Sequence, residues 1–237
     1  MSNFLLEAGR QTLMLELQEA SRLPERLGDD FIRAAETIIH CEGKLVVSGI
    51  GKSGHIGKKL AATFASTGTP AFFVHPAEAL HGDLGMLDSR DVMLFISYSG
   101  SAKELDLIVP RLEEKSIPLL AMTGKSTSPL ALAAKAVLDI AVEREACPMH
   151  LAPTSSTVNT LMLGDALAMA VMQARGFNEE DFARSHPAGA LGARLLNKVH
   201  HLMPPRRRRA ARRQRHQRHG RDARTQPHRP GAGGGLR

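Results

Sequence analysis

The chain has 237 residues, of which 43% are hydrophobic, and this is enough material for one sizeable core. Two cysteines and no run of about 18 uncharged apolar residues argue against a disulfide framework and a membrane-spanning helix, so we expect a cytoplasmic protein with no membrane partner. Aromatic residues make up only 4% of the chain and Trp is absent, which argues against a base-stacking surface for single-stranded nucleic acid.

The net charge of +7 is concentrated at the C-terminus. Residues 204–237 contain 12 Arg, no Lys and one acidic residue, Asp222, a net charge of +11, whereas the 19 basic and 23 acidic residues of positions 1–203 give −4. This tail has no apolar periodicity, so we predict that it is disordered. It could be a basic arm that binds nucleic acid nonspecifically, but we favour a frameshift product, because the composition changes abruptly after Met203. We expect no specific nucleic acid partner.

Two amphipathic helical patterns fill residues 1–42, and we expect these helices to pack on the domain that follows. Short apolar runs then alternate with helical stretches. The apolar runs are residues 44–49, 71–74, 92–97, 118–123 and 137–142. The helical stretches are residues 53–66, 102–115, 128–135 and 154–175, and only the join between the second and third runs has no clear helix. This alternation predicts an α/β domain over residues 43–203, a doubly wound five-stranded parallel sheet between two layers of helices, as in flavodoxin-like folds.

In an open parallel sheet, ligands bind beyond the carboxyl ends of the strands, so the loops after the apolar runs are the places to search. Residues 49–54, Gly-Ile-Gly-Lys-Ser-Gly, follow the first run and match the G-x-G-x-x-G pattern of dinucleotide-binding loops. The second run ends in Val74, His75 and Pro76, without the acidic residue that would hold a ribose. A Walker motif is excluded because Val46 stands where a Gly is required. A dinucleotide site is therefore the weaker interpretation, and we expect no cofactor.

Hydroxyl side chains gather at the starts of two helical stretches. They are Ser97, Ser99 and Ser101 after the third run, and Thr154, Ser155, Ser156 and Thr157 at the start of the last helix. A capping box between Ser101 and Glu104, or a simple N-cap, accounts for one hydroxyl at each helix but not for a whole cluster. Hydroxyls and backbone N–H groups at helix N-termini bind anions, so the clusters indicate a phosphorylated small molecule as the ligand.

Titratable side chains lie in the same loops. They are Lys52, His75, His81, Asp83, Glu104, Glu145 and His186. Each alone is more simply a solvated charge or a structural histidine. Lys52, Glu104 and Glu145, however, follow the first, third and fifth runs and could project over one edge of the sheet. His75 and His81 do not have the spacing of a zinc site, so a metal is not required.

Several segments, taken together, resemble a known family. They are GIGKSGHIG, ASTGTPAFFVHPAEALHGDLGM, SYSGSAKE, EREACPMHLAPTSST and LGDALAMAVMQARGFNEEDFARSHPAGALG. Their order is similar to that in the arabinose 5-phosphate isomerases of the sugar isomerase (SIS) family, over about residues 1–203. The resemblance implies the SIS fold, a homotetramer whose sites can include residues from a neighbour, and interconversion of D-ribulose 5-phosphate and D-arabinose 5-phosphate for synthesis of the lipopolysaccharide sugar Kdo. A non-catalytic SIS sugar-phosphate sensor and a heptose-phosphate isomerase are the alternatives.

The resemblance also implies roles for single residues. The catalytic residues it implies are Lys52, Glu104, Glu145 and His186. The substrate contacts it implies are Gly68, Thr69, His75, His81 and the two hydroxyl clusters, with an inhibitory zinc ion at His75. Isomerisation through an enediolate requires a carboxylate base and a cation near the developing oxyanion. We therefore expect Glu104 to act as the base and Lys52 as the cation. We expect Glu145 to shuttle protons and His186 to open the sugar ring or protonate oxygen.

Two positions depart from the pattern of the family. Tyr98 stands where the family has Asn between two Ser residues, and Ala188 replaces the second Gly of SHPGG. A ring in place of an amide could alter the contacts to the sugar. The C-terminal pair of CBS domains that is typical of the family is also missing, and the Arg-rich tail stands in its place.

Overall fold

The computed structural model describes residues 1–186. The predicted tail, Ala188 and the boundary at residue 203 therefore lie outside the described residues. Five parallel strands form one sheet in the order β2-β1-β3-β4-β5, which confirms the predicted fold class. The strands are β1 (Leu45–Gly49), β2 (Ala71–Val74), β3 (Val92–Ile96), β4 (Leu119–Thr123) and β5 (Ala136–Asp139).

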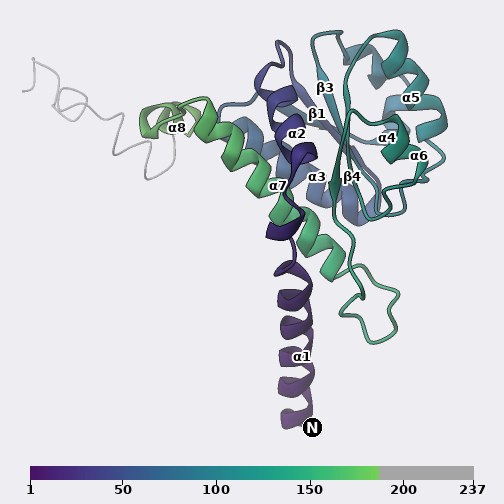
Figure 1. The fold of residues 1–237 in the computed structure, drawn as a ribbon, viewed down its shortest axis with the longest axis vertical. Helices are drawn as coiled ribbons and strands as arrows, with labels where there is room; N and C mark the ends of the chain where they lie inside the picture. The colour runs from purple at the N-terminus through teal and green to yellow at the C-terminus, as the bar shows by residue number, and fades with distance from the viewer. Residues whose placement is uncertain (187–237) are drawn as a thin grey trace, which may run out of the picture.

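Helices cover both faces of the sheet (Figure 1). One face carries α2 (Asp29–Ile39), α3 (Gly51–Ser66) and α7 (Ser155–Ala174). The other face carries α4 (Pro76–Leu80), α5 (Leu105–Glu114) and α6 (Pro129–Ala133). The remaining helices are α1 (Ser2–Ala20), α8 (Glu179–Ser185) and the short 3-10 turns η1 (Pro24–Arg26) and η2 (Asp83–Met86). Within residues 1–186, no helix is both long enough and apolar enough to span a bilayer.

The two faces of the sheet build two separate hydrophobic clusters, because successive side chains of a strand point to opposite sides. In β3, Leu94 packs with the cluster under α2, α3 and α7, whereas Met93 and Phe95 pack with the cluster under α4, α5 and α6. All five residues of β1, β3 and β4 are buried. Burial on both faces explains why these strands are continuous apolar runs in the sequence rather than alternating ones.

The structure differs from the sequence prediction at three places. The fifth strand was predicted over residues 137–142, but β5 ends at Asp139 because it is an edge strand, and the backbone after Ile140 bonds to side chains instead of a neighbouring strand. The capping box between Ser101 and Glu104, the alternative explanation of the serine loop, is not formed, since Glu104 is itself the N-cap residue of α5. The join between the second and third strands contains the short helices α4 and η2.

The N-terminal helix α1 extends away from the sheet, and only its C-terminal end reaches α7 (Figure 1). The predicted helix is confirmed, but its apolar side chains are not covered by the rest of the described chain. Phe4, Leu5, Leu6, Leu13, Met14 and Leu17 are each at least 61% exposed. Exposed large apolar side chains in this number on a projecting helix are a feature of surfaces that bind a partner.

Leu94→Ala should lower the free energy of unfolding by about 2–5 kcal/mol, because Leu94 is fully buried at the centre of the sheet and the substitution leaves a cavity. Leu132→Ala is the matched control: Leu132 is 78% exposed. Its cost should stay within about 0.5 kcal/mol. Urea denaturation of both variants measures the difference, and equal costs would contradict the assignment of the core.

Candidate functional site

The strand order changes direction between β1 and β3, since the chain runs from β1 outward to β2 and then returns to pair β3 on the other side of β1. Ligands of doubly wound sheets bind at such a switch point, at the carboxyl ends of the strands. The loop after β1 leads to Lys52, the exposed second residue of α3. The loop after β3 leads to Glu104, the partly exposed N-cap of α5. The structure therefore places these two predicted residues on loops that flank the switch point.

The glycines of the loop after β1 have a structural explanation. Gly51 has a φ of +58°, a conformation that residues with a Cβ atom rarely adopt. A Cβ atom on Gly54 would lie 2.6 Å from the carbonyl oxygen of Gly49. The close approach of α3 to β1 therefore requires a glycine at this position. No acidic residue directly follows β2, because His75 is the N-cap of α4. The loop thus has the shape of a phosphate-binding turn without the ribose anchor of a dinucleotide site.

The serine loop, residues 97–101, folds partly onto its own backbone. The Ser97 hydroxyl accepts the N–H of Gly100 at 3.2 Å, and the Ser101 hydroxyl donates to the Ser99 carbonyl at 3.2 Å. Ser99 and Ser101 remain exposed at the carboxyl edge of the sheet. The Glu104 carboxylate, which follows this loop, makes no hydrogen bond or ion pair with any of the residues 1–186. This acceptor is therefore available to a substrate.

Glu145, in contrast, is bound at the N-terminus of α7. One of its carboxylate oxygens accepts the Thr154 N–H at 2.7 Å, the Thr154 hydroxyl at 3.0 Å and the Ser156 N–H at 3.2 Å. The other oxygen accepts the Ser156 hydroxyl. The Thr157 hydroxyl donates to the Thr154 carbonyl instead. The predicted anion cradle at this helix start is therefore occupied by a side chain of the same molecule. Of the cluster, only the buried Ser155 hydroxyl has no partner among the described residues.

This arrangement lowers the pKa of Glu145 below its ordinary value. Partial burial raises the pKa, but the hydrogen bonds from Ser156 and Thr154 favour the charged carboxylate and outweigh that effect. The first turn of a 20-residue helix adds a favourable dipole. The lowered pKa favours the charged form of Glu145, which suits an electrostatic or orienting role beside the proton shuttling that we expected.

The loop after β2 carries the two predicted histidines. The Nδ1 atom of His75 accepts the Ala77 N–H at 3.2 Å, so only its Nε2 atom can bind a ligand. His81 is the exposed C-cap residue of α4. No group of three or more His, Cys, Asp or Glu side chains that could hold a metal occurs in residues 1–186. One imidazole nitrogen does not make a zinc site, so the part of the chain that the structure describes does not by itself fit a resident zinc ion.

Two predicted site residues lie at the opposite, amino-terminal edge of the sheet, and a third follows the last described helix. Gly68 and Thr69 precede β2, and the Arg175 side chain, at the C-terminal end of α7, donates to the Gly68 carbonyl at 3.1 Å. His186 follows α8, farther along the chain, where its ring stacks on Phe182. Since α7 begins beside Glu145 and its 20 residues span about 30 Å, one chain does not bring this group together with Glu145.

A pocket with a volume of about 870 Å³ lies between α1 and the loop at residues 144–150. Its wall includes Glu145 and Cys147 from the loop, and Gln11, Leu15 and Gln18 from α1. The contact of α1 with this loop could not be predicted from the sequence, since an amphipathic pattern does not tell which loop a helix will face.

Comparisons with known proteins agree with this geometry. A SIS domain matches residues 38–170 of the chain. The chain is 90% identical over 203 residues to "Arabinose 5-phosphate isomerase GutQ" of Escherichia coli strain K12, covering 86% of this chain and 63% of that protein. It is 55% identical over 198 residues to "Arabinose 5-phosphate isomerase KdsD" of Pseudomonas aeruginosa, covering 84% and 61%. The chain thus spans less than two thirds of the length of these relatives.

A solved structure of the protein c3406 from Escherichia coli CFT073, in complex with arabinose 5-phosphate, has the same fold. It superposes with a TM-score of 0.76 and 38% sequence identity, covering 79% of this chain and 100% of that one.

The lowered pKa of Glu145 predicts a specific pH dependence of stability. A carboxylate whose pKa is depressed by folding stabilises the folded state above its unfolded pKa, about 4.5, and this contribution is lost as the pH falls through the folded pKa. The difference in unfolding free energy between the wild type and Glu145→Gln should be constant near neutral pH. It should shrink as the pH falls below about 4.5, the unfolded pKa. Urea denaturation across the acid range measures it, and a difference independent of pH would contradict the assignment.

Proposed function

The chain belongs to the SIS domain family, and from this premise we propose that it is an aldose-ketose isomerase that interconverts D-ribulose 5-phosphate and D-arabinose 5-phosphate. The observation that carries this proposal is the position of Lys52 and Glu104 at the starts of the helices that follow β1 and β3, on either side of the switch point, with the Glu104 carboxylate making no hydrogen bond or ion pair within residues 1–186. The names of the two curated relatives and the sugar phosphate bound in the solved complex support the choice of substrate.

In the proposed reaction, Glu104 removes a proton from C1 of the ketose, and the C2 carbonyl becomes part of a cis-enediolate. The O1 hydroxyl proton is transferred to O2, the Glu104 carboxylic acid returns its proton to C2, and the carbonyl forms at C1, so that no redox partner is consumed. The Lys52 ammonium stabilises the negative charge on the enediolate oxygens. The exposed hydroxyls of Ser99 and Ser101 and the turn after β1 are the proposed contacts to the sugar and the phosphate.

The working unit of this proposal is a homotetramer with composite sites. Gly68 and Thr69 lie at the amino-terminal edge of their own chain and His186 follows α8, beyond the C-terminal end of α7, so in this proposal a neighbouring copy supplies them to the site that holds Lys52 and Glu104. In this arrangement His186 opens the sugar ring or moves protons between oxygens. The uncovered apolar side chains of α1 support association of several copies.

The proposed cellular role is to supply D-arabinose 5-phosphate for synthesis of the lipopolysaccharide sugar Kdo, in the cytoplasm. The names of the curated relatives support the product. Both cysteines, Cys41 and Cys147, are free thiols, which is typical of a reducing compartment and supports the location. His75 offers a single nitrogen, Nε2, to a metal. The proposed inhibitory zinc ion therefore needs further ligands from outside the described residues.

An NMR time course with D-ribulose 5-phosphate, with and without EDTA, tests the activity. We expect D-arabinose 5-phosphate to appear in both samples with wild-type protein. In Glu104→Gln the turnover should fall by at least about 10²-fold, because the amide cannot accept the C1 proton, while sugar-phosphate binding is retained. Binding without any product from the wild type would instead favour a sugar-phosphate sensor.

Mixing two inactive variants tests the composite site. Glu104→Gln and His186→Asn, each inactive alone, should regain activity when they are unfolded and refolded together, because some sites then combine an intact Glu104 with an intact His186. Size-exclusion chromatography with light scattering checks that both variants assemble as the wild type does. Mixed assemblies that remain inactive would show that one chain supplies both residues.

A further inference from the structure

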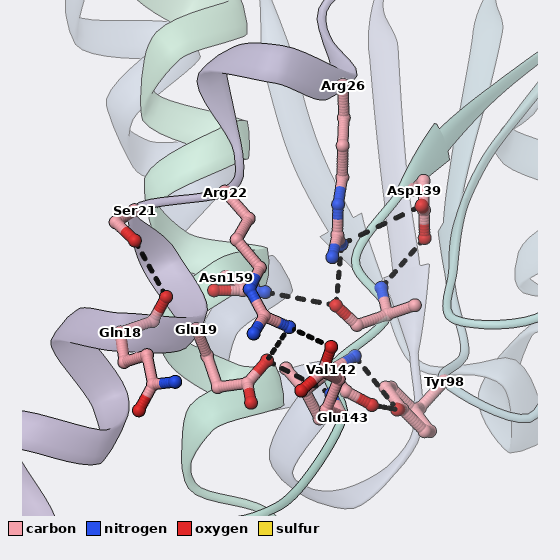
Figure 2. Close-up of polar contacts among 11 residues, drawn as sticks. Gln18, Glu19, Ser21, Arg22, Arg26, Tyr98, Asp139, Val142, Glu143 and Asn159 are labelled. Atoms are coloured by element: carbon pink, nitrogen blue, oxygen red, sulfur yellow. Dashed lines mark hydrogen bonds and ion pairs between the residues drawn. The ribbon is translucent and has the colours of Figure 1, made fainter.

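The backbone at residues 141–143, between β5 and the loop that carries Glu145, has no main-chain hydrogen bonds within the described residues. A backbone without such partners needs others, because an unpaired polar group in a partly buried place costs about 1–3 kcal/mol. Here side chains from separate parts of the chain supply its hydrogen bonds instead (Figure 2). We call residues 141–143 the braced segment.

The first partner of the braced segment is Tyr98, from the serine loop after β3. Its hydroxyl accepts the Val142 N–H at 3.2 Å and lies 3.5 Å from the Val142 carbonyl oxygen, to which it donates. The Tyr98 ring is held against Gly124, where no side chain could fit. One phenol therefore ties the loop that leads to Glu104 to the segment that leads to Glu145. The hydroxyl is needed for this tie, and the ring alone cannot provide it.

The second partner is Glu19, at the end of α1. Its side chain is only 1% exposed, and its carboxylate accepts the Glu143 N–H at 3.0 Å. Arg22 lies 3.9 Å from this carboxylate and pairs at 2.5 Å with the Glu143 side chain, which is 71% exposed (Figure 2). The pair between Arg22 and Glu143 is at the surface and contributes little. The buried bond from the Glu143 backbone to Glu19 is the stronger restraint.

The remaining partners hold Ala141. Its carbonyl accepts Arg26 at 2.6 Å and Asn159 of α7 at 3.3 Å, and its N–H donates to Asp139 at 2.8 Å. Two residues after the braced segment comes Glu145, whose carboxylate is bound at the start of the same helix α7. The segment and Glu145 thus form one short, fixed stretch, and a shift of the backbone at Val142 or Glu143 would move Glu145.

We infer that Tyr98 and Glu19 are positioning residues, which fix the braced segment and thereby hold Glu145 in its place beside the proposed site. This inference rests on the proposed function for its kinetic part and on the geometry alone for its structural part. It gives the N-terminal helix a role in the activity, and it gives the Tyr at position 98, where the resembled family has Asn, a specific task.

Two substitutions test the inference. Tyr98→Phe removes only the hydroxyl, whereas Glu19→Ala removes the carboxylate acceptor together with the rest of the buried side chain beyond Cβ. A misplacement of about 1 Å can cost about 10²-fold in rate, so we expect kcat to fall at least about tenfold in each variant, with KM within about twofold of the wild type. Glu19→Gln, which keeps an oxygen acceptor, should restore most of the rate lost in Glu19→Ala. Tyr98→Phe still tests the inference if Glu19→Ala does not fold.

Amide hydrogen exchange, measured by NMR, provides a readout that does not depend on activity. Exchange should accelerate at Val142 in Tyr98→Phe and at Glu143 in Glu19→Ala. Ser21→Ala and Glu143→Gln are the controls: the Ser21 hydroxyl donates to the Gln18 carbonyl, and Glu143→Gln keeps its backbone N–H, so both should behave as the wild type. Unchanged exchange and kcat in Tyr98→Phe, or an equal loss of kcat in Ser21→Ala, would overturn the inference. A wild type without turnover would refute the proposed function but leave the exchange result to decide on the brace.

Discussion

The capture of the Glu145 carboxylate by the N-terminus of α7 is the interaction on which the candidate site depends. The first N–H groups of a helix have no hydrogen-bond partner within the helix. An anion is the favoured partner because the helix dipole is positive at this end. Here that anion comes from the chain itself, because Thr154 and Ser156 donate to Glu145 through both backbone and hydroxyl groups. The contact closes the loop between β5 and α7 and keeps the carboxylate charged. It also leaves Glu104 as the better candidate for a base.

The sheet distributes the remaining functional groups over two edges. The change of strand order between β1 and β3 gathers Lys52 and Glu104 at the carboxyl edge. The length of α7 carries the chain back to the amino-terminal edge, where Arg175 ties the end of this helix to Gly68. This fold separates the two groups within one chain, and the proposed composite site unites them through association of copies. The exposed apolar side chains of α1 are consistent with that requirement.

Much of the fold could be predicted from the sequence because its signals are local. Continuous apolar runs such as residues 92–96 report burial on both faces of a sheet, and the loops that follow them report the ligand edge. The Thr and Ser cluster at residues 154–157 indicated an anion site. The sequence could not tell whether the anion is a ligand or Glu145, nine residues earlier, because the choice depends on the path of the loop between them.

Other features were out of reach because they depend on contacts between distant residues. The end of β5 is set in part by Arg26, which binds Ala141 from 115 residues away, and by Tyr98, which binds Val142 from 44 residues away. The apolar run over residues 137–142 gives no information about these distant partners, so it could not predict where the strand ends. The location of His186 is a similar case, since its distance from Glu145 follows from the direction of α7 rather than from any motif.

A direct titration of Glu145 tests the central claim most sharply. Carbon-13 NMR of the side-chain carboxyl groups, with Glu145→Gln to assign the signal, reports the pKa of this one residue in the folded protein. We predict a midpoint below the ordinary value of 4.5, because the α7 N-terminus stabilises the anion. A midpoint at or above that value would contradict the account, since it would mean that the carboxylate is not held by Thr154 and Ser156.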